Sequence, residues 1–225
     1  MKIALLLSVV LFYFGCETVK LNADGNPVTT DPKVNAESSS DTLVDKNLRI
    51  ALYWENTTQP HPERAAWSDV IVSNTDKYFT VYNGASDIIR FCPKYKILSK
   101  DLKTKAIGEF LVALAYYESA FNPRSSAVDV GNKNDRNSYS DGLFQMSGND
   151  SAAKIFNYTY VDLLKPIQNI NTAMYQLNIQ IKNTGLFILP NSSKYRYWAT
   201  ILDGNKYNQI KPIIDRVIKY APACK

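Results

Sequence analysis

The segment Ala115-Tyr116-Tyr117-Glu118-Ser119-Ala120-Phe121-Asn122-Pro123 closes a strongly patterned helix and carries one carboxyl group to its end. The apolar side chains before it recur at the spacing of a buried helix face. They are Leu102, Ile107, Phe110, Leu111 and Leu114. Glu118 follows Leu114 by four residues and is therefore expected on the same apolar face. Pro123 forbids continuation of the helix, and Asn122 before it is pushed out of helical geometry.

The position of Glu118 favours acid chemistry. A carboxyl group on an apolar face is partly desolvated, so we expect its pKa to rise toward neutral pH. A carboxyl group that keeps its proton near neutral pH can act as a general acid. Most glutamates near helix ends are ordinary surface residues, however, so this position needs a second feature to support it.

The second feature is the segment Ser140-Asp141-Gly142-Leu143-Phe144-Gln145, which follows farther along the chain. Together, Glu-Ser-x-Phe-Asn-Pro and Ser-x-Gly-Leu-Phe-Gln resemble the signature of lysozyme-like lytic transglycosylases and goose-type lysozymes. Either half alone would be a weak match, whereas both in this order and at this distance are specific. The resemblance covers about residues 92–210.

This resemblance implies a mainly α, lysozyme-like fold with at most a small β-hairpin, in the polar loop 124–139. It implies a lytic transglycosylase or muramidase that breaks the MurNAc–GlcNAc β-1,4 bond of peptidoglycan without a cofactor or metal ion. Glu118 would be the general acid that protonates the glycosidic oxygen. Ser140 and Gln145 would line the substrate groove. Tyr197 would stand in for the tyrosine that hydrogen-bonds near the acid in many members. The Tyr-Asn pair of those members is missing from the helix expected at 195–202, and Tyr207-Asn208 follows only after Gly204.

Other matched positions are structural. Gly142 would let the backbone pass closely, and Leu143 would face the core. Asn169-Ile170 falls where the family often has an Asn-Ile pair on a helix behind the site. The Arg, Tyr and Trp residues of 195–200 resemble a branch of lysozyme-like lipoproteins that includes enzymes acting on N-deacetylated peptidoglycan.

The reaction product depends on whether a second carboxylate is present. An inverting hydrolase needs one about 6.5–9.5 Å from the acid to activate water. Asp129, Asp135 and Asp141 are candidates, and each is equally compatible with a solvated loop position. A lytic transglycosylase needs only one acid, because the muramyl 6-hydroxyl attacks internally. Two other classes stay open: a catalytically silent glycan-binding envelope lipoprotein, and a small inhibitor or structural anchor of the envelope.

The N-terminus predicts export. Lys2 precedes an apolar run over residues 3–14, which has the length of a signal peptide and is too short to span a membrane. Cys16 follows Gly15 as in lipid-modified bacterial lipoproteins, although Tyr13 and Phe14 depart from that pattern. We therefore expect a signal peptide over 1–16 and a periplasmic protein anchored by lipid at Cys16 to the outer membrane.

Composition indicates how the remaining chain is organised and which partners it has. Residues 17–46 lack an apolar period and predict a disordered tether, which leaves 47–225 as one catalytic domain with a proper core. The 225-residue chain has a net charge of +5 but no basic block with interleaved aromatic residues, so nucleic acid is not predicted as a partner. Peptidoglycan strands are the expected partner, and we expect a monomer.

Few residues remain for other chemistries. Besides Cys16 the chain has Cys92 and Cys224, which most simply form a disulfide in an oxidising compartment. Because His61 is the only histidine, a Ser-His-Asp or Cys-His mechanism would have to use it. It lies between two prolines, where a surface position is expected. These counts favour a carboxylate mechanism.

Helical spacing predicts several further helices. We expect them at 62–78, 85–91 and 166–185, at 195–202, and around the apolar residues between Tyr207 and Ile218. Ser99 or Asp101 is expected to cap the helix that ends near Glu118, and Asn149 or Asp150 to cap a short helix through Phe156.

Overall fold

The computed structural model describes residues 49–57, 59, 61–128 and 134–225. The predicted signal peptide, Cys16 and the predicted tether lie outside these residues. Within the described residues, no helix is both long enough and apolar enough to cross a membrane.

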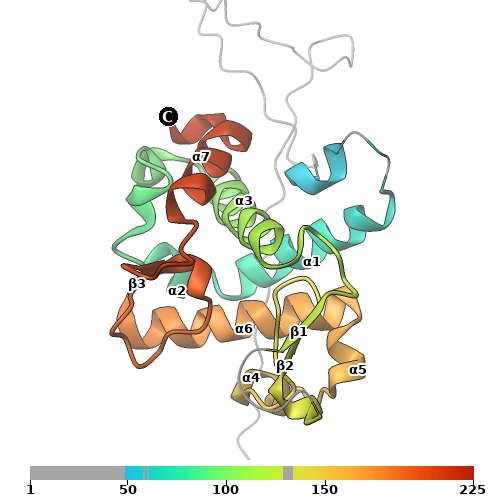
Figure 1. Cartoon of the computed structure of the whole chain (residues 1–225). Helices are drawn as coiled ribbons and strands as arrows, with labels where there is room; N and C mark the ends of the chain where they lie inside the picture. The colour runs from blue at the N-terminus through green and yellow to red at the C-terminus, as the bar shows by residue number, and fades with distance from the viewer. Residues whose placement is uncertain (1–48, 58, 60, 129–133) are drawn as a thin grey trace, which may run out of the picture. The chain divides into compact units, whose positions relative to one another are not determined.

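Helix α3, Lys100–Ser119, runs through the centre of the folded part (Figure 1). Ser99 caps it as predicted, since the Leu102 backbone N–H donates to Ser99 Oγ at 3.4 Å. Four of the five predicted apolar positions are fully buried, whereas Leu102 in the first turn is 43% exposed. The helix ends through Ala120, which adopts the left-handed conformation with φ 53° and donates its N–H to Tyr116 O. Termination therefore precedes Pro123 and comes from a left-handed cap.

Helices α1 and α7 pack against α3, and α6 packs against α1 (Figure 1). Three short helices, α2, α4 and α5, lie against α6. The bounds are α1 Glu63–Lys77, α2 Phe79–Asn83, α4 Ser151–Ile155, α5 Tyr160–Leu163, α6 Pro166–Thr184 and α7 Ile210–Tyr220. The helices predicted at 62–78 and 166–185 are confirmed. Pro166 starts α6 and Gly185, at φ 73°, ends it.

Short 3-10 turns lie before, between and after these helices. They are Tyr53–Asn56, Ile88–Arg90, Tyr95–Ile97, Arg136–Ser138, Ala199–Ile201 and Pro222–Cys224. The helix predicted at 85–91 is wrong, because only its last part forms a single turn. The Asp87 carboxylate explains the difference, since it accepts hydrogen bonds from the backbone of Phe187 and Ile188 at 2.9 and 2.8 Å. This long-range pairing holds the segment in place of a helix ladder.

The predicted hairpin is confirmed. Strand β1, Ser126–Val128, pairs antiparallel with β2, Tyr139–Asp141, so that Ala127 lies opposite Ser140. A second pair was not predicted: β3, Leu189–Pro190, runs parallel to β4, Leu202–Asp203. The second pair closes the loop that contains Tyr197, and it therefore fixes one edge of the site described below.

A disulfide joins Cys92 to Cys224 across 132 residues of sequence, with the two Cα atoms 4.5 Å apart. Both cysteines are fully buried. The predicted pairing is therefore present in the structure, and it holds the C-terminal turn beside the segment that precedes α3.

Replacing Cys92 and Cys224 together by serine is expected to lower the free energy of unfolding by on the order of 2–5 kcal/mol, because the bond restricts a long loop in the unfolded chain. Urea denaturation of both proteins measures this loss. A reductant should destabilise the wild type to the level of the variant and leave the variant unchanged. Equal stability of oxidised and reduced wild type would contradict the prediction.

Candidate active site

Glu118 lies in the last turn of α3 and is partly buried. Its side chain lines a cavity of about 300 Å³ together with residues of the hairpin and of the loop before α7. Thr200 Oγ1 donates a hydrogen bond to Glu118 Oε1 at 2.5 Å. Among the described residues that line this cavity, Glu118 is the sole acidic one. The cavity thus presents one oriented carboxyl group.

The sequence-predicted groove residues converge on this cavity. Ser140, Gln145 and Tyr197 all line it, and Thr200 completes the wall beside Glu118. Ser140 reaches the cavity from the middle of β2, whereas Gln145 is the last residue of the turn after that strand. Residues far apart in sequence therefore form one surface.

The turn after β2 forms the floor of the site. Gly142 has φ 75°, and its N–H donates to Ser125 O at 2.8 Å. Gln145 also has a positive φ, 49°, and its Nε2 donates to Gly142 O at 2.9 Å. The Gln145 amide therefore braces the turn with its nitrogen. Its remaining carbonyl oxygen is an acceptor that a ligand can use.

A side chain at position 142 would meet the chain behind it. A Cβ built on Gly142 would lie 2.3 Å from Leu163 O and 2.4 Å from Asn169 Nδ2. Asn169 is fully buried, and its Nδ2 donates to Asp141 O and Leu163 O, both at 2.8 Å. Its Oδ1 accepts from the Phe144 N–H at 2.8 Å. The Asn-Ile pair expected behind the site thus includes the residue that fastens the turn to α6.

Two further side chains hold the turn. Ser119 Oγ lies 2.9 Å from Leu143 O and 3.1 Å from Ala115 O, and its single proton is shared between these two acceptors. Trp198 Nε1 donates to Phe144 O at 2.8 Å. Leu143 is fully buried, as predicted. Ser119 belongs to the first signature segment, yet its role as a brace was not assigned from the sequence.

The helix predicted at 195–202 is wrong. The segment runs irregularly to Trp198, whose φ of −82° and ψ of 120° are extended, and forms only the 3-10 turn Ala199–Ile201. Trp198 turns its indole into the core to reach Phe144, and Thr200 O accepts from the Gln209 N–H at 2.7 Å. These long-range bonds replace the ladder of a helix. They also bring the Thr200 hydroxyl to Glu118, which no local signal in the sequence indicated.

Tyr197 bonds to the segment just before α4. Its hydroxyl donates to Asp150 Oδ2 and accepts from the Ser147 N–H at 3.1 Å. Asp150 precedes α4 as predicted, but its side chain makes no cap bond to the helix, because Oδ2 accepts from the Ser147 N–H at 2.8 Å and from the Tyr197 hydroxyl. These bonds hold Tyr197 on the cavity wall, and Thr200 donates a hydrogen bond to the acid.

The candidate second carboxylates are not on the cavity wall within the described residues. Asp141 is fully buried, where it pairs with Arg136 and accepts from Ser126 Oγ at 2.7 Å. Of the two readings left open for Asp141, neither the solvated loop position nor a place on the cavity wall is what the structure has. Asp135 is exposed and does not line the cavity. Asp129 lies outside the described residues.

A protein-family model described as the transglycosylase SLT domain matches residues 97–221, more than half of the chain. The chain belongs to this family. SLT transglycosylases cleave the glycan strands of peptidoglycan, so the protein is an enzyme of the lytic transglycosylase type. The match includes both signature segments and Thr200.

Solved structures of Bd0314 DslA are similar to this chain. A wild-type form of Bd0314 DslA is 24% identical over 78% of this chain and 98% of that chain, with a TM-score of 0.63. A glutamate-to-glutamine mutant of Bd0314 DslA is also 24% identical, over 79% and 100% of the two chains, with a TM-score of 0.64. At this identity the likeness establishes the fold, and the predicted mainly α, lysozyme-like fold is confirmed. A search of curated proteins gives no match.

Proposed function

We propose that Glu118 acts alone, first as general acid and then as general base, in breaking the MurNAc–GlcNAc β-1,4 bond. The observation that carries this proposal is the Glu118 carboxyl group on the cavity wall, oriented by Thr200. A hydrolase of the inverting type would need a second carboxylate across the cavity. Asp141 forms an ion pair with Arg136, and Asp135 does not line the cavity. The described residues therefore favour a mechanism with one acid.

The reaction then proceeds in two proton transfers. Protonated Glu118 gives its proton to the glycosidic oxygen as the bond from that oxygen to the muramyl C1 breaks, and the bonding electrons leave with the oxygen. The Glu118 carboxylate next takes the proton of the muramyl 6-hydroxyl, whose oxygen forms the new bond to C1. The product is a 1,6-anhydro sugar, Glu118 is protonated again, and no water is consumed.

The other cavity residues suit a sugar polymer. Ser140 offers a hydroxyl and Gln145 a carbonyl oxygen, the kinds of group that hydrogen-bond sugar hydroxyls and amides. Tyr197 and Tyr207 present aromatic rings, and Tyr207 is 61% exposed. We assign Ser140, Gln145 and Tyr197 to substrate binding. All three line the cavity with Glu118, where they would hold the scissile bond beside the acid.

Mass spectrometry of peptidoglycan digested in heavy-oxygen water tests the reaction type. A lytic transglycosylase is expected to give 1,6-anhydro ends without the heavy label. Labelled reducing ends would instead require hydrolysis and would contradict the single-acid proposal. Parallel digests of N-acetylated and N-deacetylated walls test the narrower resemblance to enzymes of deacetylated peptidoglycan, which predicts faster cleavage of the deacetylated wall.

We further propose that the enzyme is exported and held at the outer membrane by lipid on Cys16, with residues 17–46 as a tether to the catalytic domain 47–225. The apolar run before Gly15-Cys16 supports this proposal. Lipidation adds about 0.8 kcal/mol of membrane affinity per buried CH₂. Replacing Cys16 by serine is therefore expected to move the protein from the membrane to the soluble fraction. Equal release of wild type and variant would exclude a lipid anchor.

A further inference from the structure

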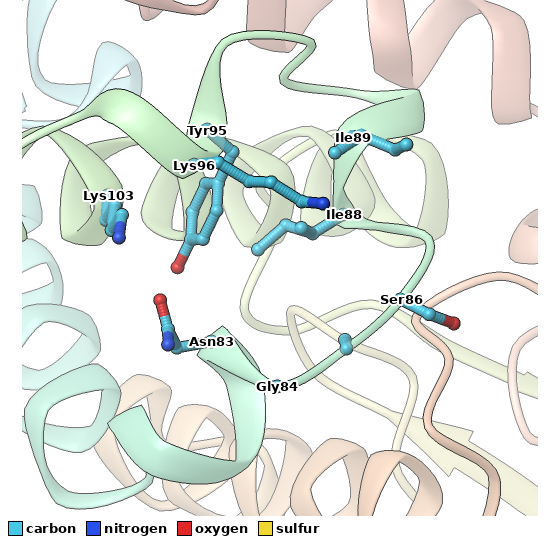
Figure 2. Close-up of a pocket in the computed structure, with 9 residues that line it drawn as sticks. Asn83, Gly84, Ser86, Ile88, Ile89, Tyr95, Lys96 and Lys103 are labelled. Carbon is cyan, nitrogen blue, oxygen red and sulfur yellow. The ribbon is translucent and has the colours of Figure 1, made fainter.

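A second pocket lies near the start of α3, at the opposite end of the helix from Glu118. It has a volume of about 340 Å³ and is formed where the end of α2 faces two 3-10 turns (Figure 2). Lys103 lies on its wall, 15 residues before Glu118 along α3. At a rise of 1.5 Å per residue, the two positions are about 22 Å apart along the helix axis. The pocket is therefore separate from the active-site cavity.

The pocket contains a buried hydroxyl group without a partner. Tyr95 is 2% exposed, and its hydroxyl has no hydrogen-bond partner among the described residues. Figure 2 shows this hydroxyl pointing toward the side chain of Asn83 across the pocket. Burial raises the pKa of the Tyr95 hydroxyl, so the group keeps its proton and remains a donor. Buried polar groups almost always have a partner, so a donor left unused among the described residues points to a ligand that reaches it when bound.

The charges and the apolar wall narrow the choice of ligand. Lys96 and Lys103 line the pocket, and the described lining residues include no carboxylate. Lys103 Nζ lies 5.3 Å from the centroid of the Tyr95 ring, which places a cation next to the buried donor. Ile88 and Ile89 supply an apolar wall, and Ile89 is 45% exposed. An anionic group with a short apolar neighbour fits this combination.

We propose that this pocket binds the terminal carboxylate and small side chain of a short peptide carried by peptidoglycan. The volume is near the lower end of the ~300–1,000 Å³ found for small-molecule pockets, so it suits a chain end better than a sugar chain. The carboxylate accepts hydrogen bonds from Tyr95 and Asn83 between the two lysines, and the apolar side chain contacts Ile88 and Ile89. This proposal rests on peptidoglycan being the substrate of the family.

Binding of a peptide end in this pocket would strengthen binding of the attached glycan strand at the active site. Once the peptide end is bound, the glycan strand stays close to the enzyme, and binding at the active site becomes an intramolecular step. The pocket would therefore lower the KM for walls that carry peptides. It would leave the cleavage of peptide-free glycan strands unchanged.

Calorimetric titration of the exported, full-length protein with N-acetyl-D-alanyl-D-alanine tests the proposal. We expect saturable binding to a single site, and no binding of the same dipeptide with its carboxylate converted to an amide. Glu118→Gln should bind the dipeptide as the wild type does, which separates this site from the catalytic one. Absence of binding, or displacement of the dipeptide by an active-site ligand, would overturn the proposal. Binding of inorganic phosphate without binding of the dipeptide would overturn it as well.

Matched variants locate the bound peptide. Tyr95→Phe removes only the hydroxyl and is expected to weaken binding roughly tenfold without lowering the melting temperature. Lys103→Gln and Lys96→Gln should each weaken binding several-fold, whereas Lys94→Gln, an exposed lysine that does not line the pocket, should have no effect. Unchanged affinity in Tyr95→Phe and Lys103→Gln would place the peptide elsewhere. Because the readout is direct binding, this test stands whether the enzyme proves to be a transglycosylase or a hydrolase.

Discussion

Glu118→Gln is expected to reduce the turnover of peptidoglycan cleavage by about 10²–10⁴-fold while the fold stays intact. Glutamine keeps the volume of the side chain and can still accept the hydrogen bond from Thr200, but it cannot deliver a proton to the glycosidic oxygen. Release of anhydro-muropeptides over time measures the loss. Thermal unfolding of the variant checks that the structure is retained, since the side chain is partly exposed and isosteric replacement leaves the packing unchanged.

Thr200→Val provides a graded comparison with this variant. Valine preserves the shape of threonine but removes the hydroxyl that orients Glu118 at 2.5 Å. We expect turnover to fall by up to about tenfold, because one hydrogen bond to the protonated acid contributes roughly 0.5–1.5 kcal/mol. Thr80→Val, an exposed position in α2, removes a hydroxyl far from the acid and should leave turnover unchanged. Wild-type turnover in Glu118→Gln would eliminate Glu118 as the acid, whatever the result for Thr200.

Gly142→Ala is expected to destabilise the protein by roughly 3–6 kcal/mol. A non-glycine residue at a φ of 75° is strained, and the new methyl group would overlap Leu163 O and Asn169 Nδ2. Moving Asn169 away would break its buried hydrogen bonds, each of which is costly to leave unmade. Chemical denaturation of wild type and variant measures the difference.

Gly185→Ala separates the two causes of that loss. Gly185 has nearly the same φ, 73°, but a methyl group there would meet no atom within 4 Å. Its substitution should therefore cost only the backbone strain, on the order of 1 kcal/mol. If both variants lose the same stability, the close approach of Gly142 to α6 has no energetic role, and the argument from Asn169 fails.

Local signals explain which helices could be predicted. The start and end of α6 follow from Pro166 and Gly185, and the buried face of α3 follows from a regular apolar spacing. The segment 195–202 shows where such signals fail. Its aromatic and aliphatic residues are compatible with a helix, but the indole of Trp198 is held by Phe144, a residue 54 positions away in sequence. Such a contact overrides local preference and cannot be read from the segment itself.

The candidate site likewise contains residues that could be predicted from the sequence and residues that could not. Ser140 and Gln145 line the cavity with Glu118, as the two signature segments led us to expect, because the hairpin returns the second segment to the end of α3. Thr200 could not be predicted, since its position depends on the irregular path of the chain after β3. The burial of the Asp141 side chain could not be predicted from the sequence either, because it depends on an ion pair with Arg136 and a hydrogen bond from Ser126.

The bond from Ser119 to Leu143 O has a consequence for motion. Ser119 adjoins Glu118 in the chain, so the acid and the cavity floor are fastened together at neighbouring residues. Local unfolding of the turn then requires fraying of the last turn of α3, and the two regions open as one cooperative unit. The amide protons of residues 143–146 should consequently exchange with solvent at the same rate as those near Glu118. The distance between Glu118 and this turn is therefore fixed before the glycan strand binds. We expect the strand, rather than the enzyme, to change conformation on binding.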